Sequence, residues 1–276
     1  MAGARVPTRG RHALRSRALA DDLIRSAGVR PGDLVLDLGA GRGILTAALR
    51  DAGARVLAVE LDADLAAGLR RRFSRDDRVC VVEGDAERVP IPQEPFAVVA
   101  NLPFAFGTAI LRRLLDDPGV PVRQIDAIVE WGLAEKRARL WPSTQLSSYW
   151  GAWHELSIAR RIPRAAFAPP PSVDAAVLRA GRRAKPLVPP SDAAGYLRLL
   201  HLGFASEAPL RRRLPRGIVH RLAHELGFSP DAGARDLDAV QWAALHRAVA
   251  SVRRGSYCAD GTNPFNPVQR GRKGVE

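Results

Sequence analysis

The sequence is poor in cysteine and has no long apolar run. Its 276 residues include two cysteines, Cys80 in an apolar stretch and Cys258 in a polar tail. Two such isolated thiols predict neither a disulfide framework nor a metal site, and they fit a reducing, cytoplasmic compartment. No apolar run approaches the roughly 18–20 residues that cross a membrane, and the Arg-rich start lacks the apolar core of a signal peptide. We therefore expect no membrane association and no metal.

Lysine and acidic residues are also scarce relative to arginine. The chain has 42 Lys+Arg against 29 Asp+Glu, a formal net charge of +13. The lysines are Lys136, Lys185 and Lys273, so nearly all of the cations are arginines, whose planar guanidinium groups suit phosphate recognition. The charge favours a polyanionic partner such as a nucleic acid. The alternative is that an Ala/Arg-rich composition reflects coding in a G+C-rich genome.

The apolar pattern divides the chain into four parts. Residues 1–18 carry five arginines and no acid, which predicts a basic arm. In 19–184, short apolar strands alternate with helical patterns, which predicts an α/β catalytic domain with a doubly wound, mostly parallel sheet. After a Pro-rich linker, the pattern of 185–252 predicts a small helical RNA-binding domain, and the Gly-, Asn- and Arg-rich 253–276 predicts disorder. Expected strands lie at 33–41, 54–62, 78–86, 96–101 and from 124; expected helices lie at 19–29, 43–53, 63–73 and 108–115.

A glycine-rich turn follows the first expected strand. In "DLGAGRG" (37–43) an Asp precedes three glycines, which let the backbone approach a ligand at a helix N-terminus. The G-x-G-x-G spacing differs from the G-x-G-x-x-G of dinucleotide sites. Glu60 and Asp85 end the next two strands, where they could bind ribose hydroxyls and an adenine amino group. The ordered set favours S-adenosylmethionine, which has no pyrophosphate; the alternative is ordinary polar strand ends.

The fourth strand ends in Asn101-Leu102-Pro103-Phe104. An exocyclic amine is a poor nucleophile because its lone pair is delocalised into the ring. Two acceptors, the Asn101 side-chain oxygen and the Leu102 carbonyl, could hold its N–H bonds and turn the lone pair toward a methyl donor. Pro103 would fix the backbone, and Phe104 would offer a face on which a flipped base stacks. The alternative is an Asn-capped turn followed by proline.

Together, "DLGAGRG", "VELD", "EGDA" and "NLPF" resemble the rRNA adenine N6-methyltransferases, a family that includes small-subunit dimethyltransferases and the Erm (erythromycin-resistance) enzymes. The resemblance covers about residues 8–250 and includes "FAPPPSVDAAVLR" (167–179). Three segments, "AFGTAILRRLL", "EWGLAEKRARLWPST" and "YWGAWHEL", look most like Erm proteins. Phe104 without a following Asn also departs from the N-L-P-Y-N usual in the small-subunit branch.

The resemblance implies an enzyme that transfers methyl from S-adenosylmethionine to N6 of one adenine in 23S rRNA. The adenine would lie near the peptidyl-transferase centre, and the enzyme would act before or during ribosome assembly. Methylation would confer macrolide-type antibiotic resistance, and the enzyme would be a monomer. The alternatives are a 16S rRNA dimethyltransferase, or an RNA-binding assembly factor without turnover. The residues leave open whether one or two methyl groups are added.

The resemblance also implies site residues. Catalysis and the target-base pocket would involve Asn101, Leu102, Pro103 and Phe104, with Phe167 as a further pocket residue or only a core anchor. Cofactor contacts would come from His12, Leu14, Gly39, Gly41, Gly43, Glu60, Leu61, Asp85, Ala86 and Asn101. Candidate RNA contacts are Arg9, Arg11, Arg112, Arg113, Lys136, Arg137, Arg139, Arg211, Arg212 and Arg213. One departure is "GRHAL" (10–14), where the family usually has G-Q-N-F-L or G-Q-H-F-L, so Arg11 replaces Gln and Ala13 replaces Phe.

Overall fold

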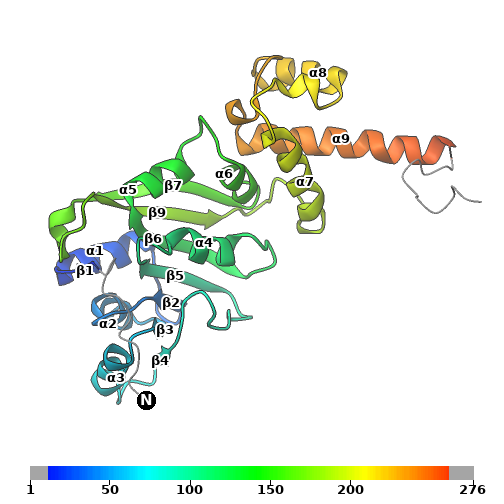
Figure 1. Ribbon diagram of the computed structural model, residues 1–276. Helices are drawn as coiled ribbons and strands as arrows, with labels where there is room; N and C mark the ends of the chain where they lie inside the picture. Colours follow the sequence, from blue (N-terminus) through cyan, green and yellow to red (C-terminus); the bar gives the residue numbers. More distant parts are fainter. Residues whose placement is uncertain (1–11, 261–276) are drawn as a thin grey trace, which may run out of the picture.

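The protein is built on a seven-stranded sheet with helices on both faces and a group of helices at one end (Figure 1). This computed structural model describes residues 12–260, of which 253–260 are described by their backbone alone. The sheet order is β4-β3-β2-β5-β6-β9-β7. Its strands are β2 (Leu34–Leu38), β3 (Arg55–Glu60), β4 (Val79–Glu83), β5 (Phe96–Asn101), β6 (Val122–Glu130), β7 (His154–Ile162) and β9 (Ala175–Arg182).

The topology confirms the predicted doubly wound, mostly parallel sheet. Neighbours from β4 through β6 are parallel, and β9 then pairs antiparallel with both β6 and β7. After β2 the chain moves outward to β3 and β4, then crosses back to β5 on the other side of β2. The switch point therefore lies between the carboxyl ends of β2 and β5. Ligands of doubly wound sheets bind in the crevice at this place.

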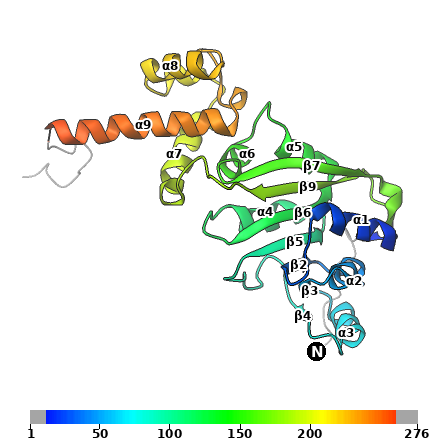
Figure 2. The same ribbon diagram turned by 180° about the vertical axis from the view of Figure 1, so that it is seen from behind.

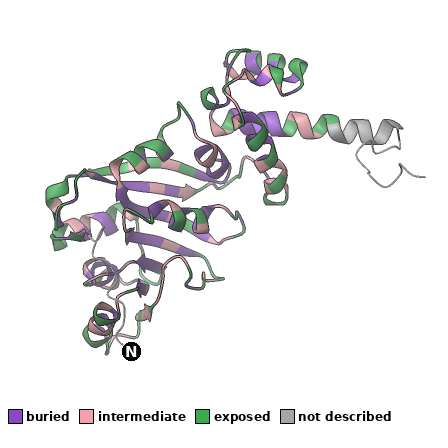
Figure 3. Ribbon diagram, viewed as in Figure 1, coloured by how far each residue is buried: buried purple, intermediate pink, exposed green. Residues whose placement is uncertain are grey.

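Two layers of helices cover the sheet. Adjacent strand residues face opposite layers, since Val35 and Val99 pack in one hydrophobic cluster and Leu36 and Val98 in the other. Burial on both faces explains why the strands are continuous apolar runs. Figure 2 shows the layers from behind, with α1–α3 on one face, and Figure 3 shows burial concentrated on the strands. The helices of the sheet domain are α1 (Arg17–Ala27), α2 (Ile44–Asp51), α3 (Ala63–Arg72), α4 (Gly107–Leu115), α5 (Trp131–Ala138) and α6 (Gln145–Trp150).

The N-terminal segment is paired with a distant part of the chain. Strand β1 (Ala13–Leu14) runs antiparallel to β8 (Phe167–Ala168), and Arg15 N–H donates to the Ala166 carbonyl at 3.0 Å. Of the arm predicted at 1–18, residues 1–11 lie outside the described part, whereas 12–18 form β1 and the start of α1. Two-residue strands have no periodicity, so this pairing could not be predicted from the sequence.

The C-terminal helices share a hydrophobic core with the sheet domain. They are α7 (Ala193–Phe204), α8 (Arg216–Leu226) and α9 (Ala239–Asp260). Tyr196 and Trp242 belong to the same buried cluster as Trp150, and Tyr196 Oη donates to the Ser148 carbonyl at 3.0 Å. The expected linker is partly buried, with Val188 0% exposed because its apolar side chain joins this core.

The last helix is longer than the sequence pattern indicated. We expected order to end near 252, but the backbone remains helical through Asp260, while 261–276 lie outside the described residues. Arg253 and Arg254 favour helix, but the residues that follow include Gly255, Ser256 and Asp260, so residue propensity does not predict this extension. Among the described residues, no helix combines the length and apolarity needed to cross a bilayer, and no cluster of His, Cys, Asp or Glu is arranged to hold a metal.

Candidate functional site

The glycine turn after β2 is in contact with the end of β5. Gly39 and Gly41 have φ of +78° and +58°, a left-handed conformation that other residues rarely adopt. A Cβ on Gly39 would stand 3.6 Å from Pro103 Cδ and 3.8 Å from the Asn101 carbonyl oxygen. The two predicted motifs thus meet across the switch point, as the parallel topology requires.

Gly43 is explained by packing between helices. It begins α2 with φ of +77°, and a Cβ there would lie 2.5 Å from Leu69 Cδ2 of α3. Such a contact is far too short for carbon atoms, so a side chain at this position would displace the Leu69 side chain, and the positive φ would strain it. Its predicted role as a cofactor contact has no geometric support comparable to that of Gly39.

Glu60 closes the other side of the glycine turn. Its Oε2 accepts from Gly41 N–H at 2.7 Å, and its Oε1 accepts from Asp62 N–H at 2.9 Å. A carboxylate has about four lone-pair positions, so each oxygen can accept a further hydrogen bond. The next side chain, Leu61, is 48% exposed and adds an apolar surface beside the carboxylate. This combination suits a ribose and an attached planar base.

Asp85 and Ala86 follow β4, the next strand along the sheet. Asp85 Oδ1 accepts from Glu87 N–H at 2.8 Å, and the side chain is 40% exposed. Arg113 of α4 donates to the Ala86 carbonyl at 3.0 Å and also to the Val89 carbonyl. Arg113 therefore holds the segment that carries Asp85, and burial lowers its pKa. The guanidinium of Arg113 is thus occupied within the fold, so this structure gives no support to its predicted RNA contact.

Asp37 lies beneath the glycine turn as a buried acid, 1% exposed. Burial raises the pKa of Asp37 to about 7, opposed by hydrogen bonds from Thr46, while nearby Glu60 raises it further. Thr46 Oγ1 donates to Asp37 Oδ2 at 2.6 Å, whereas Oδ1 has no partner among the described residues. Partial protonation near neutral pH reduces the charge repulsion between Asp37 and Glu60.

The amide of Asn101 is oriented by the N-terminal segment. Asn101 Nδ2 donates to the backbone carbonyl of His12 at 2.7 Å. Its Oδ1 is buried and has no partner among the described residues, although a buried amide oxygen normally has one. The bond to His12 thus fixes which end of the amide is the acceptor. No described residue donates to the Leu102 carbonyl, whereas the Pro103 carbonyl accepts from Phe106 N–H.

An aromatic group surrounds this amide. The rings of His12 and Phe104 have centroids 5.3 Å apart, and Phe104 meets Phe167 edge-on at 6.5 Å. His12 Nδ1 lies 2.9 Å from the Pro169 carbonyl oxygen, which ties the segment to the strand that carries Phe167. Phe167 is 1% exposed and Leu14 is 6% exposed. Both are core residues here: Phe167 supports Phe104, and Leu14 anchors β1.

The predicted RNA contacts among the described residues are either bonded within the fold or exposed without an ion pair. Arg137 is buried, donates to Thr144 Oγ1 at 3.0 Å and lies over the Trp150 ring, so its guanidinium is held within the fold like that of Arg113. Arg213 donates to the Leu202 carbonyl at 2.6 Å. Arg112 and Arg211 form ion pairs with Asp116 and Asp231, respectively. Lys136, Arg139 and Arg212 are exposed and form no ion pair with a described residue. Arg9 and Arg11 lie outside the described residues.

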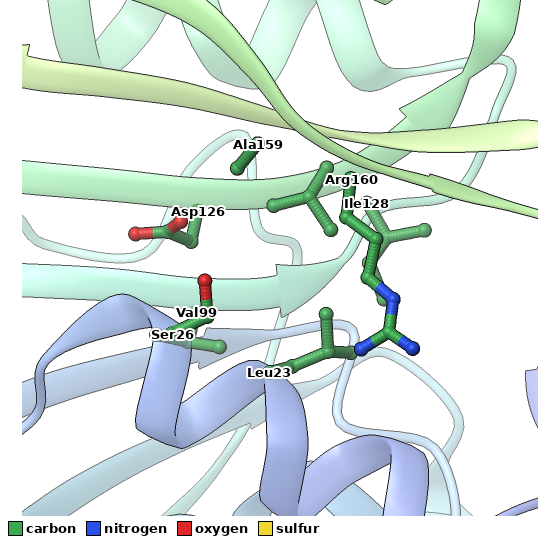
Figure 4. Close-up of a pocket in the computed structure, with 8 residues that line it drawn as sticks. Leu23, Ser26, Val99, Asp126, Ile128, Ala159 and Arg160 are labelled. Carbon is green, nitrogen blue, oxygen red and sulfur yellow. The ribbon is translucent and has the colours of Figure 1, made fainter.

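A small cavity lies between α1 and the sheet, away from these residues. Its volume is about 10 Å³, and its lining includes Leu23, Ser26, Asp126 and Arg160 (Figure 4). That space holds about one water molecule. It is too small for a nucleoside, so it is not the site of a ligand of that size.

The chain is similar to proteins that modify ribosomal RNA. A family model described as "Ribosomal RNA adenine dimethylase" matches residues 7–243. Ribosomal RNA small subunit methyltransferase A of Synechococcus sp. (strain JA-3-3Ab) is 34% identical over 252 residues, covering 86% of this chain and 90% of that protein. The mycinamicin-resistance protein MyrB of Micromonospora griseorubida is 34% identical over 256 residues, covering 88% and 80%. The crystal structure of the 23S rRNA methyltransferase ErmE superposes with a TM-score of 0.77 at 27% identity, covering 86% and 99%.

Proposed function

We propose that this chain acts on one adenine of 23S rRNA. The premise is that the chain belongs to the ribosomal RNA adenine dimethylase family and is an S-adenosylmethionine-dependent rRNA adenine methyltransferase. The observation that carries this choice is the match to ErmE over 86% of the chain at a TM-score of 0.77. Phe104, where the small-subunit branch usually has Tyr, and the similarity to MyrB support it. Methylation near the peptidyl-transferase centre would then protect the ribosome from macrolide-type antibiotics.

A 16S rRNA target is the second candidate function. It is favoured by the 34% identity to the Synechococcus small-subunit methyltransferase over 86% of this chain. Identity at this level is equal for the two branches, so the substrate must be distinguished by experiment.

The residues at the switch point fit S-adenosylmethionine. Glu60 would accept hydrogen bonds from the ribose hydroxyls, Leu61 would pack against the adenine ring, and Asp85 would bind its amino group. Gly39 and Gly41 would let the backbone lie against the amino-acid portion. When bound, the cofactor supplies an electrophilic methyl group on a sulfonium, so no metal or strong nucleophile is required of the protein.

The target adenine would be held by the end of β5. The unpartnered Asn101 Oδ1 and the Leu102 carbonyl would accept the two N6–H bonds, and Phe104 would stack on the ring. With both hydrogens held, the lone pair of the nitrogen points away from the ring plane and can attack the methyl carbon. The sulfonium would supply the methyl group and its sulfur would keep the electron pair of the broken bond, while the proton lost by the amine held at Asn101 and Leu102 would pass to solvent. Positioning supplies most of the acceleration.

Primer extension on both large rRNAs tests the substrate. In a host that lacks both the 23S and the 16S methylation, expression of the chain is expected to confer macrolide resistance and, if two methyl groups are added, to produce a reverse-transcription stop on 23S rRNA. The Asn101→Ala variant, expressed at the same level, is the control and should give neither. A stop only on 16S rRNA would replace the 23S proposal with the second candidate. Mass spectrometry of the modified nucleoside would count the methyl groups added.

Salt dependence separates arginines that bind RNA from those that stabilise the fold. The Lys136→Ala/Arg139→Ala double variant is expected to weaken RNA binding and lower the slope of log affinity against log salt by about one to two. Arg137→Ala should leave the slope unchanged and destabilise the protein by about 1–3 kcal/mol, because it loses a hydrogen bond and its ring contact. Filter binding between 50 and 300 mM salt and thermal unfolding measure the two effects. An unchanged slope in the double variant would contradict the electrostatic assignment.

A further inference from the structure

The loop that joins α5 to α6 exposes two large apolar side chains at its tip. Leu140 is 60% exposed and Trp141 is 52% exposed, whereas Trp150, Trp153 and Trp242 are buried. Each Å² of apolar surface that stays in water forgoes about 25 cal/mol of burial free energy, so leaving about half of a tryptophan side chain exposed is unfavourable. Adjacent exposed apolar residues of this size are characteristic of binding surfaces.

Both ends of this loop are fixed by hydrogen bonds. Ser143 N–H donates to the Arg235 carbonyl at 2.8 Å, joining the loop to the C-terminal helices. Thr144 caps α6 reciprocally with Ser147, and Arg137 donates to Thr144 Oγ1. Figures 1 and 2 show the loop rising as a narrow projection beside the C-terminal helices. Trp141 is therefore exposed on a loop whose ends are held in place by hydrogen bonds.

Positive charge lies beside the tryptophan. Lys136 lies in the last turn of α5 and Arg139 follows the helix directly; both are exposed, and neither forms an ion pair with a described residue. A hollow of about 140 Å³ beside the loop is lined by Arg139, Leu140 and Arg183 together with the acidic Glu155 and Asp238. Arg183 is paired with Glu155 at 3.0 Å, so the unpaired charge is that of Arg139 and Lys136. An aromatic face next to unpaired cations is the combination that binds single-stranded nucleic acid.

The loop is within reach of the catalytic end of the sheet. Leu102 N–H donates to the Ile128 carbonyl near the end of β6, and α5 begins at Trp131 directly after that strand. The eight residues of α5 span about 12 Å at 1.5 Å per residue. An RNA strand whose target base lies at Asn101 could therefore follow the exposed face of α5, past Lys136, and reach Trp141 within a few nucleotides.

We propose that Trp141 stacks on an unpaired base of the substrate RNA, with Arg139 and Lys136 on the neighbouring phosphates. This base is a second one, distinct from the target adenine at Phe104. The inference rests on the rRNA methyltransferase activity of the chain, but it is independent of whether the substrate is 23S or 16S rRNA. In this proposal the loop contributes to RNA affinity and to the alignment of the RNA strand in the site, and it takes no part in the chemical step.

Steady-state kinetics on an RNA fragment test the stacking. Trp141→Ala is expected to raise KM for RNA about tenfold, with kcat and KM for S-adenosylmethionine changed less than about twofold. Trp141→Phe keeps a flat ring and should recover most of the affinity, whereas Trp141→Leu keeps apolar bulk without a ring and should not. Equal KM values for wild type and Trp141→Ala, or full recovery by Trp141→Leu, would overturn the proposal. The assay uses whichever rRNA fragment the wild type methylates, so a wrong choice between 23S and 16S does not affect it.

Fluorescence quenching gives an independent readout of the same contact. Trp141 is the most exposed of the described tryptophans, so RNA should quench its emission and shield it from acrylamide. The effect should disappear in Trp141→Phe and persist in Trp131→Phe, whose wild-type ring is covered by Arg161 at 5.0 Å. Quenching that survives Trp141→Phe would contradict the proposal. Sedimentation without RNA should show a monomer; self-association that is lost in Trp141→Ala would instead assign the surface to a second copy of the chain.

Discussion

Replacing Asn101 by alanine is expected to reduce methyl transfer by about 10²- to 10³-fold or more. The loss has the size seen when one preorganised polar group is removed from a reacting centre. The reason is that the two ends of the Asn101 amide have different roles: Nδ2 donates to the protein, and Oδ1 would accept from the substrate. Nδ2 is held by the His12 carbonyl at 2.7 Å, which leaves the buried Oδ1 as a fixed acceptor without a partner among the described residues.

The Asn101→Ala variant must be shown to fold and to bind cofactor. Removing the amide leaves the His12 carbonyl without its donor, a cost of about 1–3 kcal/mol, so the midpoint of thermal unfolding should fall by several degrees. Calorimetry should give a dissociation constant for S-adenosylmethionine within a few-fold of wild type. Asn101→Asp keeps an acceptor but replaces the donor with an oxygen facing the His12 carbonyl, and we expect intermediate activity. Near-normal turnover by Asn101→Ala would rule out the clamp.

The parts of this site that the sequence predicted are those encoded by strand order. A glycine turn after β2, acids after β3 and β4, and Asn101 at the end of β5 meet because parallel strands place their carboxyl ends on one edge. Repeating apolar runs and turn residues locate each strand within a few positions. The chemistry of each strand end can then be inferred from residue type.

The contact between His12 and Asn101 could not be predicted in this way. The two residues are 89 positions apart, and their bond uses the His12 backbone, which every sequence possesses. The departures in "GRHAL" are compatible with this role, because Arg11 and Ala13 alter side chains but not the carbonyl. The pairing of β1 with β8 likewise depends on two-residue strands that have no pattern.

The arginine-rich composition does not identify which arginines are available to bind RNA. Net charge does not show whether a particular guanidinium faces solvent or caps carbonyls inside the fold, and a long side chain can do either. For Arg137 a signal was present, because Ala134 and Ala138 lie on the same side of α5 and Ala134 is buried. Arg113 gave no such signal, since its partners are the carbonyls of Ala86 and Val89 on a separate segment.

Replacing Phe104 by alanine is expected to lower kcat/KM for RNA by about 10- to 100-fold, the value of one stacked base, and to leave S-adenosylmethionine affinity within about twofold. The ring is partly exposed, while its edge contact with buried Phe167 and its neighbour His12 fix its plane. A base that enters between this face and the Asn101 amide is restrained in the plane that the two acceptors require. Single-turnover assays at saturating cofactor measure the effect.

Matched substitutions at Phe104 separate stacking from packing. Phe104→Tyr and Phe104→Trp retain a flat face and should keep at least about a tenth of the activity. Phe104→Leu fills similar apolar volume against Phe167, so its stability should stay close to that of wild type while its activity falls toward that of the alanine variant. If Phe104→Leu were as active as wild type, Phe104 would be a packing residue, and the orientation of the adenine would depend on the Asn101 and Leu102 acceptors alone. The leucine variant is decisive because it changes the aromatic face without emptying the space behind it.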